Sequence, residues 1–170
     1  MADVEWSKLF LLPYSFIKQP YFQSLQYKIL NNILNCNQQL KKWKIKESEQ
    51  CIYCSEVDTL IHHLYDCVES KKIWKNLEIW MKNNLKLTFK LTICEVIFGI
   101  PIIVYKNMNV LNFLILITKY YINKNRTGNR PLFFFELLQT IKNLCFINKE
   151  ISLRNAQEMD ACTQILCDTV

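Results

Sequence analysis

Residues 51–67, CIYCSEVDTLIHHLYDC, decide how this 170-residue chain is organised. In this stretch Cys51, Cys54, His62 and Cys67 form the pattern C-x2-C-x7-H-x4-C, and both histidines of the chain fall inside it. Three thiols and one imidazole are a complete ligand set for tetrahedral zinc, because this ion accepts thiolate sulfur and neutral imidazole nitrogen. The stretch therefore predicts a zinc knuckle held by three cysteines and one of the two histidines.

Helix geometry leaves open which histidine binds the metal. If Thr59 caps a helix that runs through Cys67, then His62 and Cys67 are five positions apart and lie well off one face of a regular helix. His63 and Cys67 are an i, i+4 pair and would share a face. The residues alone slightly favour His63, and a kink near Asp66 is expected if His62 is the ligand.

The same cysteines have two other interpretations. A C-x-x-C pair can consist of small buried side chains, or it can be a redox pair. The redox interpretation requires a thioredoxin-like βαβ context, which the sequence does not predict. Four ligands at such compact spacing favour zinc. A closed shell of four ligands also argues against catalytic zinc, which keeps an open position, and the sequence offers neither a Ser/His/Asp set nor a Gly-rich phosphate loop.

Composition predicts a folded helical chain in a reducing compartment. The chain is 51% apolar and 13% aromatic, which is enough to build a core, and its two glycines and four prolines argue against a turn-rich β-sandwich. The acidic start, Met1 to Trp6, lacks the apolar region of a signal peptide. A nuclear or cytoplasmic location is therefore expected, with the cysteines outside the knuckle reduced: Cys36, Cys94, Cys145, Cys162 and Cys167.

Apolar periodicity predicts an all-α fold of about six helices around the one knuckle. Helices are expected over residues 21–36, 38–43, 59–85 (one long or two abutting), 92–98, 110–125 and from 131 onward. Asn37, Thr59, Thr92 and Asn109 are the expected N-caps, and Pro131 is expected in a first turn. The most apolar run, residues 110–122, is too short to span a bilayer, so no membrane partner is expected.

The predicted organisation is a single helical domain over residues 1–170. Residues 1–85 supply helices and the zinc knuckle, and residues 86–155 supply a helical carboxy-terminal lobe.

Basic residues form two candidate surfaces for nucleic acid, in keeping with a net charge of +6. The first surrounds Trp43 with Lys41, Lys42, Lys44 and Lys46. The second contains Lys119, Lys124, Arg126 and Arg130. Lysines would meet phosphates, and Trp43 or Tyr53 could stack on a base. The alternative is that the lysines form a solvated face and that Trp43 packs its helix against the knuckle.

Several pieces of the chain resemble one known family in the family's own order. They are residues 25–30, the Asn-led segment from Asn37 to Ile45, the knuckle with Thr59 and Trp74, and the downstream segments 97–99 and 120–126. Together they resemble the carboxy-terminal zinc-binding (CCHC) domain of reverse transcriptases from non-LTR (LINE-type) retrotransposons. In that family the histidine lies three positions after the threonine, so the resemblance selects His62 over His63. It also implies nucleic acid, RNA more than DNA, and a reverse-transcriptase polymerase domain as partners.

The chain departs from complete reverse transcriptases of that family. It contains no Asp-Asp pair for a polymerase metal site and no Pro-Asp for a restriction-like nuclease, and residues 156–170 are a divergent tail. We therefore expect a zinc-dependent nucleic-acid-binding accessory module without polymerase or nuclease activity. The alternative is a zinc-stapled structural or protein-interaction module, or a remnant, whose partner was the polymerase body. That alternative predicts an exposed apolar patch.

Overall fold

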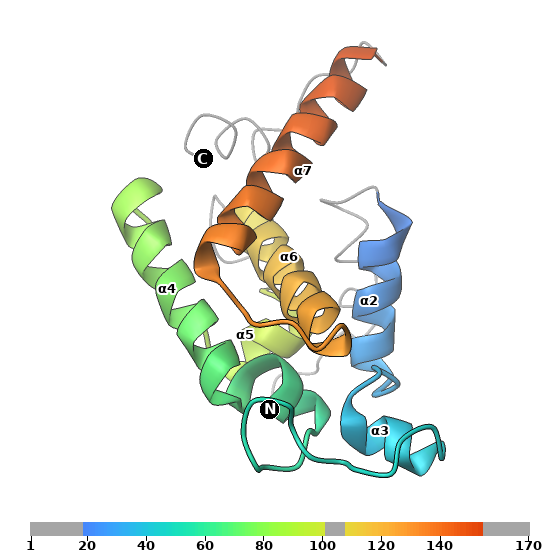
Figure 1. The fold of residues 1–170 in the computed structure, drawn as a ribbon. Helices are drawn as coiled ribbons and strands as arrows, with labels where there is room; N and C mark the ends of the chain where they lie inside the picture. The colour runs from blue at the N-terminus through green and yellow to red at the C-terminus, as the bar shows by residue number, and fades with distance from the viewer. Residues whose placement is uncertain (1–18, 101–107, 155–170) are drawn as a thin grey trace, which may run out of the picture.

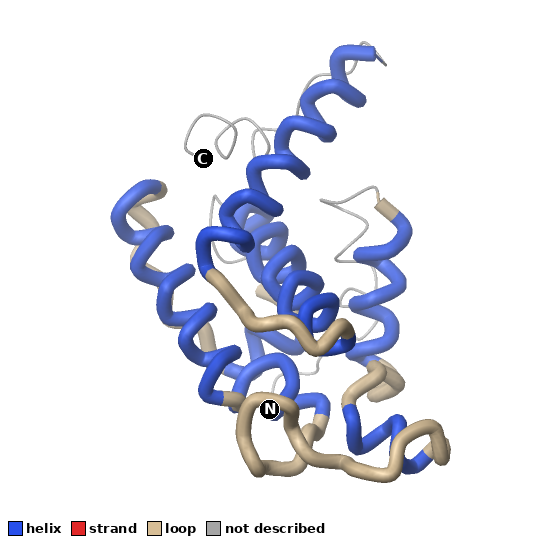
Figure 2. Tube along the Cα trace, viewed as in Figure 1, coloured by secondary structure: helices blue, strands red, loops and turns tan. Residues whose placement is uncertain are grey.

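The computed structural model describes residues 19–100 and 108–154. In chain order their helices are α2 (Pro20–Leu30), α3 (Asn37–Lys42), the π-helical turn η1 (His62–Asp66), α4 (Val68–Asn84), α5 (Ile93–Phe98), α6 (Met108–Thr127) and α7 (Phe134–Arg154). Among these residues the only β pairing is an isolated bridge between Gln50 and Val57. The all-α prediction is confirmed (Figure 2). The predicted tail, 156–170, lies outside the described residues.

Helix α6 is the central element of the fold. It contacts α2, α5, α7 and η1, and Figure 1 shows it between α4 and α2 with α7 alongside. All residues from 110 to 119 are buried, so α6 is apolar on nearly every side, as expected of a core helix surrounded by others. None of the helices in the described ranges combines the length and apolar character needed to cross a membrane.

Helix α2 is shorter than its apolar pattern predicts. The pattern runs to Cys36, but the helix ends at Leu30, and Asn32 adopts a left-handed backbone with φ of 53°. Asparagine tolerates this conformation better than most residues, so the pair Asn31-Asn32 turns the chain. Leu34 is buried beyond the turn, which explains why the apolar spacing continues after the helix has stopped.

The other helix boundaries follow local signals with some corrections. The capping box of Thr92 and Glu95 is present at the start of α5, and Gly99 ends that helix with φ of 83°. Asn109 was expected to cap α6 but lies inside it. Pro131 was expected in a first helical turn, but α7 begins three residues later at Phe134.

Candidate metal centre

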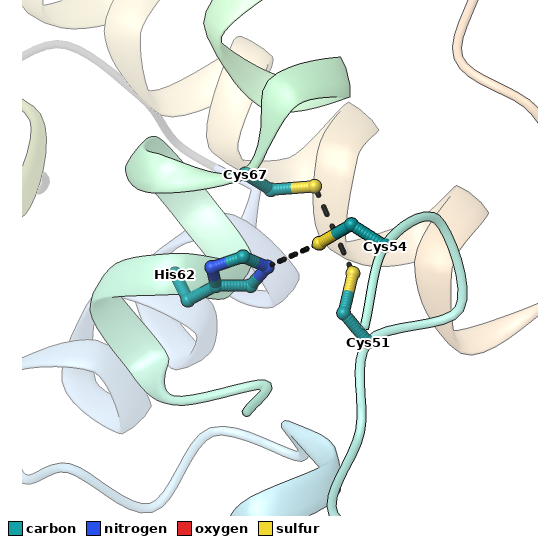
Figure 3. A group of neighbouring side chains, drawn as sticks. All are labelled: Cys51, Cys54, His62 and Cys67. Carbon is teal, nitrogen blue, oxygen red and sulfur yellow. Dashed lines mark hydrogen bonds between the residues drawn. The ribbon is translucent and has the colours of Figure 1, made fainter. Parts of the chain in front are cut away.

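The structure gathers the side chains of Cys51, Cys54, His62 and Cys67 into one cluster (Figure 3). Their ligand atoms all lie within 4.8 Å of one another. The Sγ atoms of Cys51 and Cys67 are 3.7 Å apart, and Cys54 Sγ is 3.3 Å from His62 Nε2. Zinc–sulfur bonds of about 2.3 Å in a tetrahedron place two sulfurs about 3.8 Å apart. The sulfur spacing therefore fits thiolates that share one zinc ion, and it is far too long for a disulfide.

A tight turn directs the first two cysteines toward the cluster. The backbone N–H of Cys51 donates to Glu56 O at 2.8 Å, which closes the loop next to the Gln50–Val57 bridge. Within that loop the N–H of Tyr53 points at Cys51 Sγ at 3.4 Å. The two-residue spacing thus places Cys51 and Cys54 on one shared turn, with a backbone donor on the Cys51 sulfur.

A π-helical turn explains why His62 faces the thiols. The N–H of Cys67 donates to His62 O at 3.0 Å, a bond between residues five apart, which defines a π turn. Thr59 Oγ1 accepts from the N–H of His62 at 3.1 Å, so Thr59 caps this segment as predicted. The regular-helix argument for His63 was wrong because the widened turn brings residues five apart onto one face. The expected kink falls at Cys67, where the backbone leaves helical geometry before α4.

His63 points away from the thiols and pairs with Asp58. Its side chain is 2% exposed, and Nδ1 lies 3.1 Å from Asp58 Oδ2. Burial lowers the pKa of His63, which favours a neutral ring that donates to the carboxylate. Burial alone would raise the pKa of Asp58, but hydrogen bonds from His63 and from the Asn37 backbone, together with the charge of Arg126, lower it to about 2. His63 is therefore part of the support behind the cluster.

Arg126, near the end of α6, completes this support. Its Nη2 donates to Asp58 Oδ1 at 2.6 Å and to Cys51 Sγ at 3.0 Å, and its side chain is 2% exposed. Burial raises the pKa of Cys51, but the Tyr53 N–H, His62 and the charge of Arg126 outweigh it and lower the pKa to about 6. A thiolate is thereby favoured, and the thiolate is the form that binds zinc. No local motif pointed to Arg126, which lies 75 residues from Cys51.

Taken together, a helical scaffold and a compact Cys3His group define the chain as a protein with a structural zinc-binding domain. Comparison with protein families gives the type: residues 4–74 match the family model described as zinc-binding in reverse transcriptase. This part of the chain, which holds all four clustered side chains, is a zinc-binding domain of the reverse-transcriptase type. The zinc prediction is confirmed at the level of the domain. No curated protein and no solved structure matches the chain.

The first candidate nucleic-acid surface lies on the last turn of α3 and the residues that follow it. Lys41, Lys42, Lys44 and Lys46 are exposed, and Trp43 is 45% exposed, so the alternative of a buried, packing Trp43 does not hold. Two of the lysines have partners within the chain: Lys41 pairs with Glu49 at 3.2 Å and Lys46 donates to Asn37 at 2.9 Å. The Lys41–Glu49 pair is solvent-exposed and therefore weak, so the surface offers an exposed indole with Lys41, Lys42 and Lys44 beside it.

The second candidate surface is smaller than the sequence suggested. Lys124 and Arg130 are exposed and line a polar pocket of about 190 Å³ with Tyr120. Arg126 and Lys119 are buried, which corrects their assignment as phosphate contacts. Lys119 Nζ donates to Gln26 Oε1 at 2.5 Å inside the core, and burial lowers its pKa to about 7. Arg126 was misassigned because a charge in the last turn of a helix was taken as exposed, and Lys119 because a charge in the middle of an apolar helix was taken to face solvent.

Proposed function

We propose that the protein binds RNA through the surface formed by Trp43 and its neighbouring lysines, next to a structural zinc centre. Trp43 supports this most directly. Its side chain is 45% exposed between lysines and is not part of the hydrophobic core, so its exposed ring is available to a ligand. A base can stack on an exposed indole, and ammonium groups beside it can neutralise the flanking phosphates. Single-stranded RNA, or single strands beside structured RNA, is the substrate class that combines both contacts.

The zinc ion acts as a structural staple in this proposal. The donor set fits zinc with four protein ligands, so the coordination shell is closed to substrate. When bound, the ion supplies folding energy and fixes the loop between Cys51 and Val57 against η1. We infer that the chain has neither polymerase nor nuclease activity, in keeping with the missing Asp-Asp pair. The origin we infer is the carboxy-terminal part of a LINE-type reverse transcriptase.

A salt titration tests the RNA proposal. Replacing Lys41, Lys42 and Lys44 together by glutamine should weaken binding to a single-stranded RNA and lower the slope of log affinity against log salt by about 2, since each lost phosphate contact contributes about 0.7. Fluorescence anisotropy at several salt concentrations measures both quantities. An unchanged slope would rule out phosphate contacts at this surface.

The matched control removes three positive charges elsewhere. Lys75, Lys82 and Lys90 are exposed, and α4, which carries two of them, lies away from α3 (Figure 1). Their replacement by glutamine changes the net charge by the same amount, so equal losses in the two triple variants would indicate unspecific attraction. Trp43→Ala separates stacking from charge: affinity should fall by about 1–3 kcal/mol with the salt slope unchanged.

A second candidate function is docking against a reverse-transcriptase polymerase domain. The observation that favours it is a mainly apolar groove of about 570 Å³, lined among others by Ile29, Ile61, Ile93 and Ile97. Cys94, exposed on α5, also lines this groove. If docking is the function, Cys94→Glu should abolish binding of a purified polymerase domain and leave RNA affinity intact. Binding of RNA without any binding of the polymerase domain would favour the first proposal.

A further inference from the structure

Arg126 joins the cysteine cluster to a part of the chain that the family match does not cover. The match ends at residue 74, whereas Arg126 belongs to the last turn of α6. Its Nη2 nevertheless lies 3.0 Å from Cys51 Sγ and 2.6 Å from Asp58 Oδ1. Its guanidinium carbon lies 5.0 Å from the centre of the Tyr53 ring. Three residues of the knuckle region thus hold one arginine that comes from outside it.

The charges of the site require a cation at this position. Zinc with three thiolates and one neutral imidazole carries a net charge of −1, and the ionised carboxylate of Asp58 adds another negative charge behind it. Both Cys51 and Asp58 are buried, so solvent screens their repulsion poorly. The guanidinium donates to both anions at once, because Nη2 carries two N–H groups and each can face one acceptor.

Hydrogen bonds to metal ligands tune how firmly the ligands hold the metal. A donor on a thiolate sulfur withdraws charge from it, and such outer partners fix the orientation of the ligand. Cys51 receives two donors in this structure, the backbone N–H of Tyr53 and the side chain of Arg126. The backbone donor belongs to the knuckle turn itself, so Arg126 is the donor that depends on the position of α6.

We propose that Arg126 is a positioning residue of the zinc centre, which makes zinc binding depend on α6, a helix outside the matched segment. It orients the Cys51 thiolate and compensates the paired negative charges of the cluster and Asp58. This inference rests on zinc binding and is independent of whether the protein binds RNA. Substitutions of comparable outer partners reduce metal affinity by about 10–100-fold, and the same range is expected here.

The test compares Arg126→Gln and Arg126→Lys with Arg130→Gln in the full chain. Arg130 is exposed and four residues further on, so its substitution removes the same charge without touching Cys51 or Asp58. Competition with a chromophoric chelator gives zinc affinity. The spectrum of the cobalt-substituted protein reports on the sulfur, because loss of an N–H···S bond shifts the sulfur-to-cobalt charge-transfer band to lower energy.

Arg126→Gln should lower zinc affinity about 10–100-fold and shift the charge-transfer band, whereas Arg130→Gln should change neither. Arg126→Lys should recover part of the affinity, because its ammonium keeps the positive charge beside Asp58 but lacks the planar, longer guanidinium that places two N–H groups on the two acceptors. If Arg126→Gln does not fold, the proposal is tested with the folded Arg126→Lys variant, through the position of its sulfur-to-cobalt charge-transfer band. Zinc affinity within twofold of the unmutated chain, with an unshifted band, in a folded Arg126 variant would overturn the proposal.

Discussion

At the scale of single residues, Asp58 is where three segments of the chain meet. Its carboxylate accepts from the Asn37 backbone at 2.9 Å, from His63 at 3.1 Å and from Arg126 at 2.6 Å. Each partner comes from a different element: α3, η1 or α6. Removing the carboxylate would leave buried donors without an acceptor, which costs more than a missing contact alone.

The lowered pKa of Asp58 predicts a pH-dependent stability term. Because the pKa falls from 3.8 to about 2 on folding, the ionised carboxylate stabilises the protein fully above about pH 4, and this contribution is lost as the pH falls toward 2. It is on the order of 2 kcal/mol. Urea unfolding of the unmutated chain and Asp58→Asn should give a difference that is constant from pH 7 to 4 and narrows below pH 4. A difference that stays constant to pH 2.5 would contradict this role.

How well each residue of the site could be predicted depends on how far it lies along the chain from the other residues of the site. Cys51, Cys54 and Cys67 could be recognised from spacing because a knuckle gathers ligands that are close along the chain. Helix geometry slightly favoured His63 and only the family resemblance selected His62, since the deciding feature was backbone geometry that periodicity does not reveal. The role of Arg126 at the cluster could not be predicted, because its contact with Cys51 exists only once α6 packs against η1.

At the scale of elements, the π turn of η1 is the feature that periodicity could not reveal. Apolar spacing is interpreted with 3.6 residues per turn, and one extra residue in a single turn leaves the flanking patterns intact. The turn frees backbone carbonyls, and side chains of α4 satisfy two of them. Ser70 Oγ donates to His63 O at 3.0 Å, and Trp74 Nε1 donates to Leu64 O at 2.7 Å. Helix α4 therefore holds the geometry that presents His62.

Trp74→Phe should destabilise the protein by about 1–3 kcal/mol, because it keeps most of the buried ring but leaves the carbonyl of Leu64 without its donor. Urea unfolding at neutral pH measures the change. Trp80→Phe is the control, since Trp80 lies on the same helix but is only partly buried. Equal small losses in both variants would show that the indole hydrogen bond does not hold the turn.

The boundaries of α2 and α7 show a second limit of helix prediction from apolar spacing and local signals. The apolar spacing through Leu34 predicted a helix that the Asn31-Asn32 turn interrupts, because burial continued on an extended segment. Pro131 was compatible with a first helical turn, but α7 starts only at Phe134. The capping box of Thr92 was recognised because both partners lie within four residues.

At the scale of the whole molecule, two sources of stability are expected to act on different regions. Apolar packing around α6 holds α2, α5 and α7, with Phe113, Leu114 and Ile117 almost fully buried. The knuckle loop buries little apolar surface of its own, because Ile52 and Val57 are exposed. Structural zinc contributes about 10–16 kcal/mol in peptide systems. The organisation of residues 1–170 as a single domain stays a prediction of the sequence.

Zinc removal should therefore destabilise the knuckle region before it destabilises the core around α6. Chelation is expected to increase amide hydrogen exchange in residues 50–67 and in α3, whereas the middle of α6 keeps its protection. Hydrogen exchange followed by mass spectrometry, with and without chelator, measures this, and readdition of zinc is the control. Equal loss of protection in the knuckle and in residues 113–117 would show that zinc holds the entire fold.

Zinc stoichiometry is the decisive measurement, because it reports whether Cys51, Cys54, His62 and Cys67 bind one ion. Elemental analysis should find one zinc per unmutated chain and none in Cys51→Ser or His62→Ala. His63→Asn, whose amide can still donate to Asp58, should retain the ion. Zinc retained in His62→Ala and lost in His63→Asn would show that His63 is the ligand. No zinc in the folded unmutated chain would show that these side chains do not form a zinc site.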